Sequence, residues 1–299
     1  MTNRATTGSQ EALGQMLPGQ AAAARAVMGV MTHGRRDSQL PQWARSLEIA
    51  AAPLAELNLR LAILTAGDVN DTPWPTMSVP LETLPSQGDL GFSQSMNRLM
   101  ARAFANSQTT WFLCVDASGV FHRETLVRLV AAARAHPQSL IEARQFPREH
   151  TKQYDPVTGE TPWACGACLL IPRTVYETIG GFDPVFVEQL ADVDFSWRAR
   201  RAGFTVRVCG GALFGHGAAQ EEPADLAGQR QLLLSARYLA FKWGHEPTWR
   251  MAEERLLAGG HFVDREALPT LPNLGPWEDR DRAGIADFSQ FFWFAPTRW

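Results

Sequence analysis

The chain has 299 residues, of which 45% are hydrophobic, 10% aromatic and 20% charged. This composition excludes an intrinsically disordered chain and a fibrous protein, and the length fits one large α/β domain or two smaller domains that share an interface. The formal net charge of −3 does not favour binding to a phosphate backbone, so nucleic acid is not expected as the main partner.

Membrane insertion and secretion are not expected either. The longest apolar runs, residues 111–115 and 167–171, are far shorter than the roughly 20 residues that cross a bilayer. The first 25 residues lack the continuous apolar stretch of a secretory signal, which predicts a cytoplasmic protein. The four cysteines are too few for a disulfide scaffold. Cys165 and Cys168 form a CxxC without a second pair of zinc ligands, and we interpret the thiols as buried structural groups.

The first half of the chain alternates buried strands with amphipathic helices. Apolar patterns predict strands at residues 27–32, 57–64 and 111–115, and helices at 38–51 and 92–103. Each strand is followed by a polar loop, a succession typical of an open parallel α/β sheet. Because ligands of such sheets bind outside the carboxyl ends of the strands, we expect these loops to converge on one site.

The second half changes character after residue 143. A helix is predicted at 124–135 and a strand at 139–143, and the polar, turn-rich segment 144–163 is interpreted as a mobile loop. Further elements are expected as a strand at 167–171, helices at 172–179 and 190–202, a strand at 204–208 that ends before Gly210–Gly211, and a helix at 229–243. The Pro-, Trp- and Phe-rich tail 269–299 is expected to pack on the core, with contact to a membrane surface or a second subunit left open.

Acidic and imidazole side chains stand at the expected strand ends and helix starts. They lie in three motifs: Asp116-Ala-Ser118, Ala191-Asp-Val-Asp194, and Phe214-Gly-His216-Gly. Four further stretches lie between these motifs or overlap them: Gly166-Ala-Cys-Leu-Leu-Ile-Pro-Arg173, Ile179-Gly-Gly-Phe-Asp183, Asp192-Val-Asp-Phe-Ser-Trp-Arg198 and Ala202-Gly-Phe204. In order and spacing these residues resemble the nucleotide-sugar glycosyltransferases of family 2, which have the GT-A fold.

The resemblance implies an α/β fold with a Rossmann-like, mainly parallel central sheet flanked by helices. A flexible segment 1–24 would precede a GT-A catalytic domain at 25–220. That domain would comprise a nucleotide-binding half, 25–118, and an acceptor-binding half, 119–220. Residues 221–299 would form a C-terminal extension of a helix and an aromatic-rich tail.

The resemblance also implies a divalent cation, Mg²⁺ or Mn²⁺, that neutralises charge on the departing diphosphate. Asp116 and His216 would hold it. Ser118 stands where the family usually has a second carboxylate, and a hydroxyl binds these ions more weakly. Two alternatives remain open: a metal site completed by diphosphate oxygens, with Ser118 as a weak ligand, or a metal that is partly dispensable.

A sugar hydroxyl attacks only when a base takes its proton. By resemblance Asp192 is that catalytic base, although the Glu that usually precedes it is Ala191 here. Asp194 lies two residues further, hence on another helix face, and is expected to pair with Arg198.

The remaining candidate residues would bind the nucleotide and the sugars. By resemblance the nucleotide contacts are Thr32, His33 and Arg35 in the first loop and Asp68 or Asp71 at the base or ribose. Trp163 is a candidate platform for a sugar ring, with core packing as an equal alternative. The region of the acceptor and donor sugar is completed by Gly166, Asp183, Asp194 and Arg198.

The subgroup that the sequence most resembles adds rhamnosyl, galactofuranosyl or related sugars to bacterial polysaccharides. It implies inverting, non-processive transfer of one sugar from a nucleoside diphosphate sugar to a glycan or lipid-linked acceptor, with peripheral association at the inner membrane left open. No GxGxxG, Walker or GxSxG motif favours a dehydrogenase, a P-loop NTPase or a hydrolase. Ser118 and Ala191 support the rival hypothesis, a catalytically degenerate protein that binds a sugar nucleotide or a partner transferase.

Overall fold

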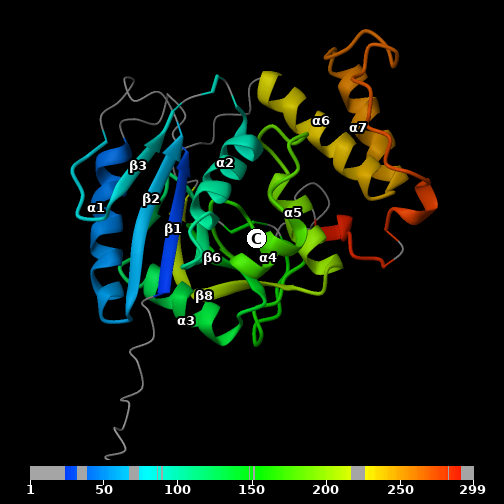
Figure 1. Ribbon diagram of the computed structural model, residues 1–299. Coiled ribbons are helices and arrows are strands. Elements are labelled where there is room, and N and C mark those ends of the chain that lie inside the picture. The colour runs from blue at the N-terminus through cyan, green and yellow to red at the C-terminus, as the bar shows by residue number, and fades with distance from the viewer. Residues whose placement is uncertain are drawn as a thin grey trace, which may run out of the picture.

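A computed structural model describes residues 24–31, 39–66, 74–85, 87–88, 90–147, 149–150, 152–216, 226–281 and 283–290. Within these residues eight strands form one sheet flanked by helices (Figure 1). The strands are β1 Ala24–Met31, β2 Leu59–Ala66, β3 Leu81–Leu84, β4 Thr109–Asp116, β5 Val120–Phe121, β6 Ser139–Pro147, β7 Cys168–Pro172 and β8 Thr205–His216. The helices are α1 Leu40–Ala51, α2 Phe92–Phe104, α3 Thr125–Ala135, α4 Arg173–Ile179, α5 Ala191–Arg201, α6 Leu226–Lys242 and α7 Glu246–Ala258.

The sheet has the strand order β3-β2-β1-β4-β7-β6-β8-β5. Strands β3, β2, β1 and β4 are parallel, and β6 is parallel to β8. Strand β7 lies antiparallel between β4 and β6, so β4, β6 and β8 run in the same direction. Their carboxyl ends therefore meet at one edge of the sheet, which places Asp116, Gln145 and His216 at that edge.

The sheet is held together by one continuous apolar core that reaches from β1 to α6. Strand β4 is buried on both faces, as its unbroken apolar run predicts. In β1, a Cβ at Gly29 would lie 2.1 Å from the Phe112 ring of β4, so glycine is required for this close approach. Helix α2 buries Met96, Leu99 and Ala103, in agreement with the helical spacing of these residues.

Helices α6 and α7 pack against each other beside α5 (Figure 1). Trp243, which follows α6, meets Trp197 of α5 edge to face, with ring centroids 5.4 Å apart. Phe288 is also buried against Trp197, at 5.0 Å. The described part of the tail thus packs on the core as expected, whereas residues 291–299 lie outside the described residues.

The structure differs from the sequence prediction mainly around residues 144–163. Strand β6 continues to Pro147, and Lys152, Thr161 and Trp163 are buried. The interpretation of the whole segment as a mobile loop was therefore wrong, because polar side chains within it are paired inside the protein. Strand β8 likewise continues through Gly210–Gly211 to His216. Of the cysteines, Cys114, Cys165 and Cys168 are buried free thiols, as interpreted from the sequence.

In the part of the chain that is described, no helix combines the length and the apolar character needed to cross a membrane.

Candidate active site

The carboxyl ends of β4 and β8 bring Asp116 and His216 together. His216 Nε2 lies 3.2 Å from Asp116 Oδ2, and both side chains are about one quarter exposed. The backbone N–H of Ser118 donates to Asp116 Oδ1 at 2.8 Å. On the other side of the imidazole, His216 Nδ1 lies 3.4 Å from Gln145 Oε1. When Nδ1–H donates to this amide oxygen, Nε2 keeps its lone pair for a metal ion.

Asp116 and His216 fit a divalent cation. Two ligand atoms of an octahedral ion with bonds of about 2.1 Å are separated by about 3 Å, close to the separation of Asp116 Oδ2 and His216 Nε2. No set of three or more His, Cys, Asp or Glu side chains could hold a metal together within the described ranges. A cation bound here would need further oxygen ligands, which the phosphates of a substrate can supply.

Asp192 lies in the first turn of α5. Its Oδ2 accepts a hydrogen bond from the N–H of Gly166 at 2.9 Å, and its Oδ1 accepts one from the N–H of Val193 at 2.9 Å. Leu190, the residue before the helix, has φ 67° in the left-handed region, a conformation that costs a non-glycine residue about 1 kcal/mol. The buried Leu190 side chain helps to hold the turn that directs Asp192 toward Gly166.

The protonation of Asp192 is shifted in the direction that a base requires. Burial raises the pKa of the Asp192 carboxyl, and the N–H groups of Gly166 and Val193 and the Lys152 ammonium oppose this rise without cancelling it. A raised pKa brings a carboxylate closer to the range in which it accepts a proton efficiently at neutral pH.

The backbone of residues 166–167 links Asp192 to Asp116. The N–H of Gly166 binds Asp192, and the carbonyl of Ala167 accepts the N–H of Asp116 at 2.9 Å. A Cβ at Gly166 would meet Phe92 at 3.2 Å and Asp192 at 3.6 Å, so the absence of a side chain permits this close contact. The carboxylate of Asp192 and the Asp116–His216 pair therefore lie at the same edge of the sheet.

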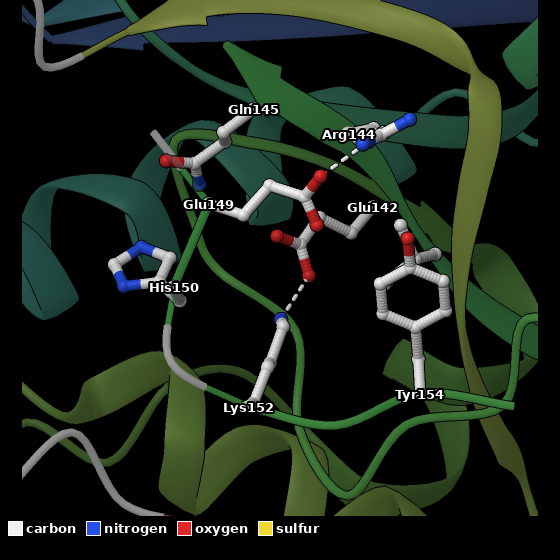
Figure 2. A pocket seen from close by; sticks show the side chains of 8 residues that line it. Glu142, Arg144, Gln145, Glu149, His150, Lys152 and Tyr154 are labelled. Atoms are coloured by element: carbon white, nitrogen blue, oxygen red, sulfur yellow. Dashed lines mark hydrogen bonds and ion pairs between the residues drawn. The ribbon is translucent and has the colours of Figure 1, made fainter. Parts of the chain in front are cut away.

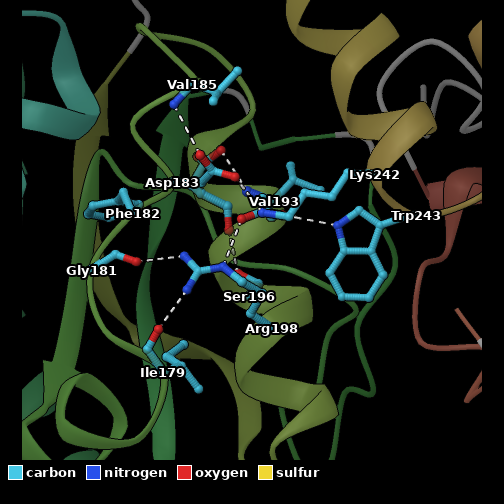
Figure 3. A network of polar contacts seen from close by, with 12 residues as sticks. Ile179, Gly181, Phe182, Asp183, Val185, Val193, Ser196, Arg198, Lys242 and Trp243 are labelled. Carbon is cyan, nitrogen blue, oxygen red and sulfur yellow. Dashed lines mark hydrogen bonds and ion pairs between the residues drawn. The ribbon is translucent and has the colours of Figure 1, made fainter. Parts of the chain in front are cut away.

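Asp183, Asp194 and Arg198, which the resemblance assigned to the sugar region, belong to one network of polar contacts; Figure 3 shows Asp183, Arg198 and Lys242 in it. Asp194 is fully buried; it binds Arg198 Nε at 2.8 Å, Lys242 Nζ at 2.8 Å and Trp243 Nε1 at 3.0 Å. The expected pairing of Asp194 with Arg198 is thus present.

The outer part of this network holds the turn between α4 and α5. Arg198 donates further bonds to the carbonyls of Ile179 and Gly181, and Asp183 accepts from Lys242 Nζ at 2.6 Å. Although burial alone raises the pKa of Asp183, the hydrogen bond and charge of Lys242 bring it below its usual value. The network fastens α6 to α5 and to that turn; contact of these residues with a sugar stays a prediction.

Trp163 is 4% exposed. The ammonium of Lys152 lies 4.2 Å from its ring centroid, and the His150 ring lies 5.2 Å from it. Core packing and cation–π contact therefore describe Trp163 in this structure, and a role as a sugar platform remains a prediction.

A polar pocket that was not predicted from the sequence (Figure 2) is linked to this site through Gln145, whose Oε1 faces His216 Nδ1. The pocket is lined by Glu142, Arg144, Gln145, Glu149, His150, Lys152, Tyr154 and Val208. One signal was available: Glu142 stands inside the apolar run of a predicted buried strand, where a carboxylate needs a partner. Its partner is Lys152, and each of the two side chains is 4% exposed. The candidate nucleotide contacts Thr32, His33, Arg35, Asp68 and Asp71 lie outside the described residues.

The fold of this chain is similar to that of solved glycosyltransferase structures, whereas its sequence matches no known family. No protein-family model and no curated protein sequence matches the chain. Among solved structures, the mannosyltransferase PcManGT from Pyrobaculum calidifontis, in complex with GDP-Man and Mn²⁺, is similar with a TM-score of 0.53 and 14% identity, over 80% of this chain and 76% of that one. GalNAc-T7 with UDP, GalNAc and Mn²⁺ has a TM-score of 0.53 and 10% identity, over 79% of this chain and 52% of that one. The expected GT-A fold is confirmed.

Proposed function

We propose that this chain is a glycosyltransferase that moves one sugar from a nucleoside diphosphate sugar to a hydroxyl of a glycan or lipid-linked glycan. The transfer inverts the anomeric centre and serves the synthesis of bacterial surface polysaccharide. The observation that carries the proposal is the position of Asp192, a carboxylate with a raised pKa, beside the Asp116–His216 pair at the carboxyl edge of the sheet.

The solved neighbours support the choice of donor. One was solved with GDP-Man and the other with UDP, each together with Mn²⁺. In this chain Asp116 and His216 would hold the divalent cation, which would neutralise negative charge on the diphosphate leaving group. The backbone N–H of Ser118 fixes Asp116 through Oδ1, so Oδ2 stays directed toward His216.

The reaction that fits this arrangement is a single displacement. Asp192 takes the proton from the acceptor hydroxyl, and the acceptor oxygen forms a bond to the anomeric carbon. The bond from that carbon to the diphosphate oxygen breaks, and the nucleoside diphosphate leaves with the electron pair. Attack opposite to the leaving group gives inversion.

Replacement of Asp192 by asparagine tests the proposal. The asparagine side chain retains an oxygen that can accept the N–H of Gly166 but cannot take a proton. We expect the release of nucleoside diphosphate from GDP-mannose, UDP-GalNAc or dTDP-rhamnose, whichever wild type consumes, to slow by about 10²- to 10⁴-fold in Asp192→Asn. Donor affinity, measured by calorimetry, should stay within about twofold of wild type.

Asp264→Asn is the matched control, because Asp264 is exposed and distant in sequence from the site; its rate should equal that of wild type. An Asp192→Asn variant at the wild-type rate would show that Asp192 is not the base. Tight donor binding by wild type without any turnover would instead support the degenerate binding protein.

A further inference from the structure

The polar pocket of Figure 2 is linked through its lining residues to the Asp116–His216 pair and to Asp192. Gln145 connects it to the Asp116–His216 pair, since Gln145 Oε1 faces His216 Nδ1 at 3.4 Å. Consecutive backbone N–H groups connect it to the candidate base: that of Cys165 binds Glu142, and that of Gly166 binds Asp192. A group held in the pocket would thus be close to both.

Two buried polar atoms of the pocket have no hydrogen-bond partner among the described residues. Gln145 is 6% exposed, and its amide Nε2 makes no hydrogen bond to any described residue. The same holds for the ring Nε2 of His150. In Figure 2 the Gln145 amide and the His150 ring lie on one side of the pocket, with Tyr154 on the other. Because leaving a buried polar atom unpaired costs about 1–3 kcal/mol, these two atoms indicate a ligand that completes them.

The chemistry of the pocket selects an uncharged ligand. Its charged side chains are matched in two ion pairs, Lys152 with Glu142 and Arg144 with Glu149, so their formal charges cancel. Burial lowers the pKa of His150 to about 3, and the ring is neutral at physiological pH. A phosphate or a metal ion would find no net opposite charge here.

The size and the hydrogen-bonding groups point to a hydroxyl. The free space inside the pocket admits about one water-sized group, too little for a whole sugar ring. The Gln145 amide N–H donates, and the neutral imidazole nitrogen donates or accepts. A hydroxyl both donates and accepts and is therefore complementary to this pair.

We propose that Gln145 and His150 form a subsite that binds one hydroxyl or hydroxymethyl group of a sugar and so selects the identity of that sugar. The inference rests on the proposed function and deepens it. The hydroxyl comes either from the sugar of the donor or from the acceptor glycan. A site that hydrogen-bonds a hydroxyl discriminates against an analogue that lacks it, because the buried polar atoms are then unpaired.

Calorimetry on two variants tests the subsite. His150→Leu removes one hydrogen-bonding ring, and Gln145→Glu replaces the amide donor while an oxygen can still face His216. The exposed residues His136 and Gln138 supply the matched controls His136→Leu and Gln138→Glu. In the donor arm, the affinity for GDP-mannose or UDP-GalNAc is compared with that for the same nucleotide carrying a deoxy analogue of the sugar, all with Mn²⁺. In the acceptor arm, methyl glycosides and their deoxy analogues are titrated into protein saturated with GDP or UDP.

Wild type should bind a sugar more tightly than its deoxy analogue in one arm, by about tenfold. Both pocket variants should lose this preference, and both controls should keep it. If the preference is lost in the donor arm, the bound hydroxyl belongs to the donor sugar. If it is lost in the acceptor arm, the hydroxyl belongs to the acceptor glycan. If the variants keep the wild-type preference in both arms, or wild type shows none, the pocket holds only an ordered water and the proposal is overturned. Failure of wild type to bind any nucleoside diphosphate would instead refute the proposed function itself.

Discussion

At the scale of single residues, His150 combines burial with an ionisable ring. Burial lowers its pKa from 6.5 to about 3, and the nearby Lys152 ammonium and His216 act in the same direction. In the unfolded chain the ring takes up a proton near pH 6.5, whereas the folded protein does so only near pH 3. Between these values the unfolded state binds more protons, so the free energy of unfolding decreases as the pH falls.

We therefore expect wild type to lose stability between about pH 7.5 and 5 more steeply than His150→Leu does. The difference between the two slopes should approach about 1.4 kcal/mol per pH unit below about pH 6.5, measured by urea unfolding at a series of pH values. His136→Leu, which changes an exposed ring, should retain the wild-type slope. Parallel curves for wild type and His150→Leu would show that His150 is protonated in the folded protein.

Ala191 is the second residue whose identity matters at this scale. It is 1% exposed, so a carboxylate here would be buried beside Asp192 and would raise the pKa of Asp192 further. In this chain the orientation of Asp192 is fixed instead by the N–H groups of Gly166 and Val193. The absence of the Glu that the resemblance implies at position 191 therefore leaves the candidate base oriented.

At the scale of elements, α5 carries the candidate base and is fastened to α6 by Lys242. The Lys242 ammonium contacts Asp183 at 2.6 Å and the fully buried Asp194 at 2.8 Å. Removing one partner of a buried ion pair leaves an uncompensated charge.

Lys242→Met should therefore lower the free energy of unfolding by about 3 kcal/mol, measured by urea unfolding at about pH 7.5. The matched control is Arg250→Met, which breaks the exposed pair of Arg250 with Glu246 on α7 and should change stability by less than about 0.5 kcal/mol. Equal losses in the two variants would contradict a special role of Lys242 in holding α6 to α5.

Element predictions from sequence succeeded where the signal was local and long. The spacing of Phe92, Met96, Leu99 and Ala103 predicts α2, and the structure has it at Phe92–Phe104. Strands β3 and β5 have only four and two residues. They are too short to show the alternation of apolar and polar residues by which a strand is predicted from sequence. The antiparallel direction of β7 was not predicted because a strand buried on both faces has the same pattern in either direction.

At the scale of the whole molecule, the edge of the sheet that carries the site and the proximity of Asp116 and His216 could be predicted. The order of strands and loops and the resemblance in motif order indicated them. The polar pocket could not. Its pairing of Glu142 with Lys152 joins strand β6 to the segment that follows it. The Gln145 amide nitrogen, which has no hydrogen-bond partner in the described part of the chain, is apparent only once β6 is known to continue to Pro147. Side chains that pair across a tertiary contact produce no periodic spacing of residues in the sequence.

We propose that this edge of the sheet binds a nucleoside diphosphate through a divalent cation held by Asp116 and His216. Calorimetric titration of wild type and His216→Ala with GDP and with UDP, each with and without Mn²⁺, separates the contribution of the ion from that of the imidazole. We predict Mn²⁺-dependent binding of at least one nucleotide by wild type, and an affinity at least about tenfold lower in His216→Ala. His136→Ala, in an exposed position, should bind as wild type does. Equal binding by wild type and His216→Ala in Mn²⁺, or no binding of either nucleotide, would contradict the claim.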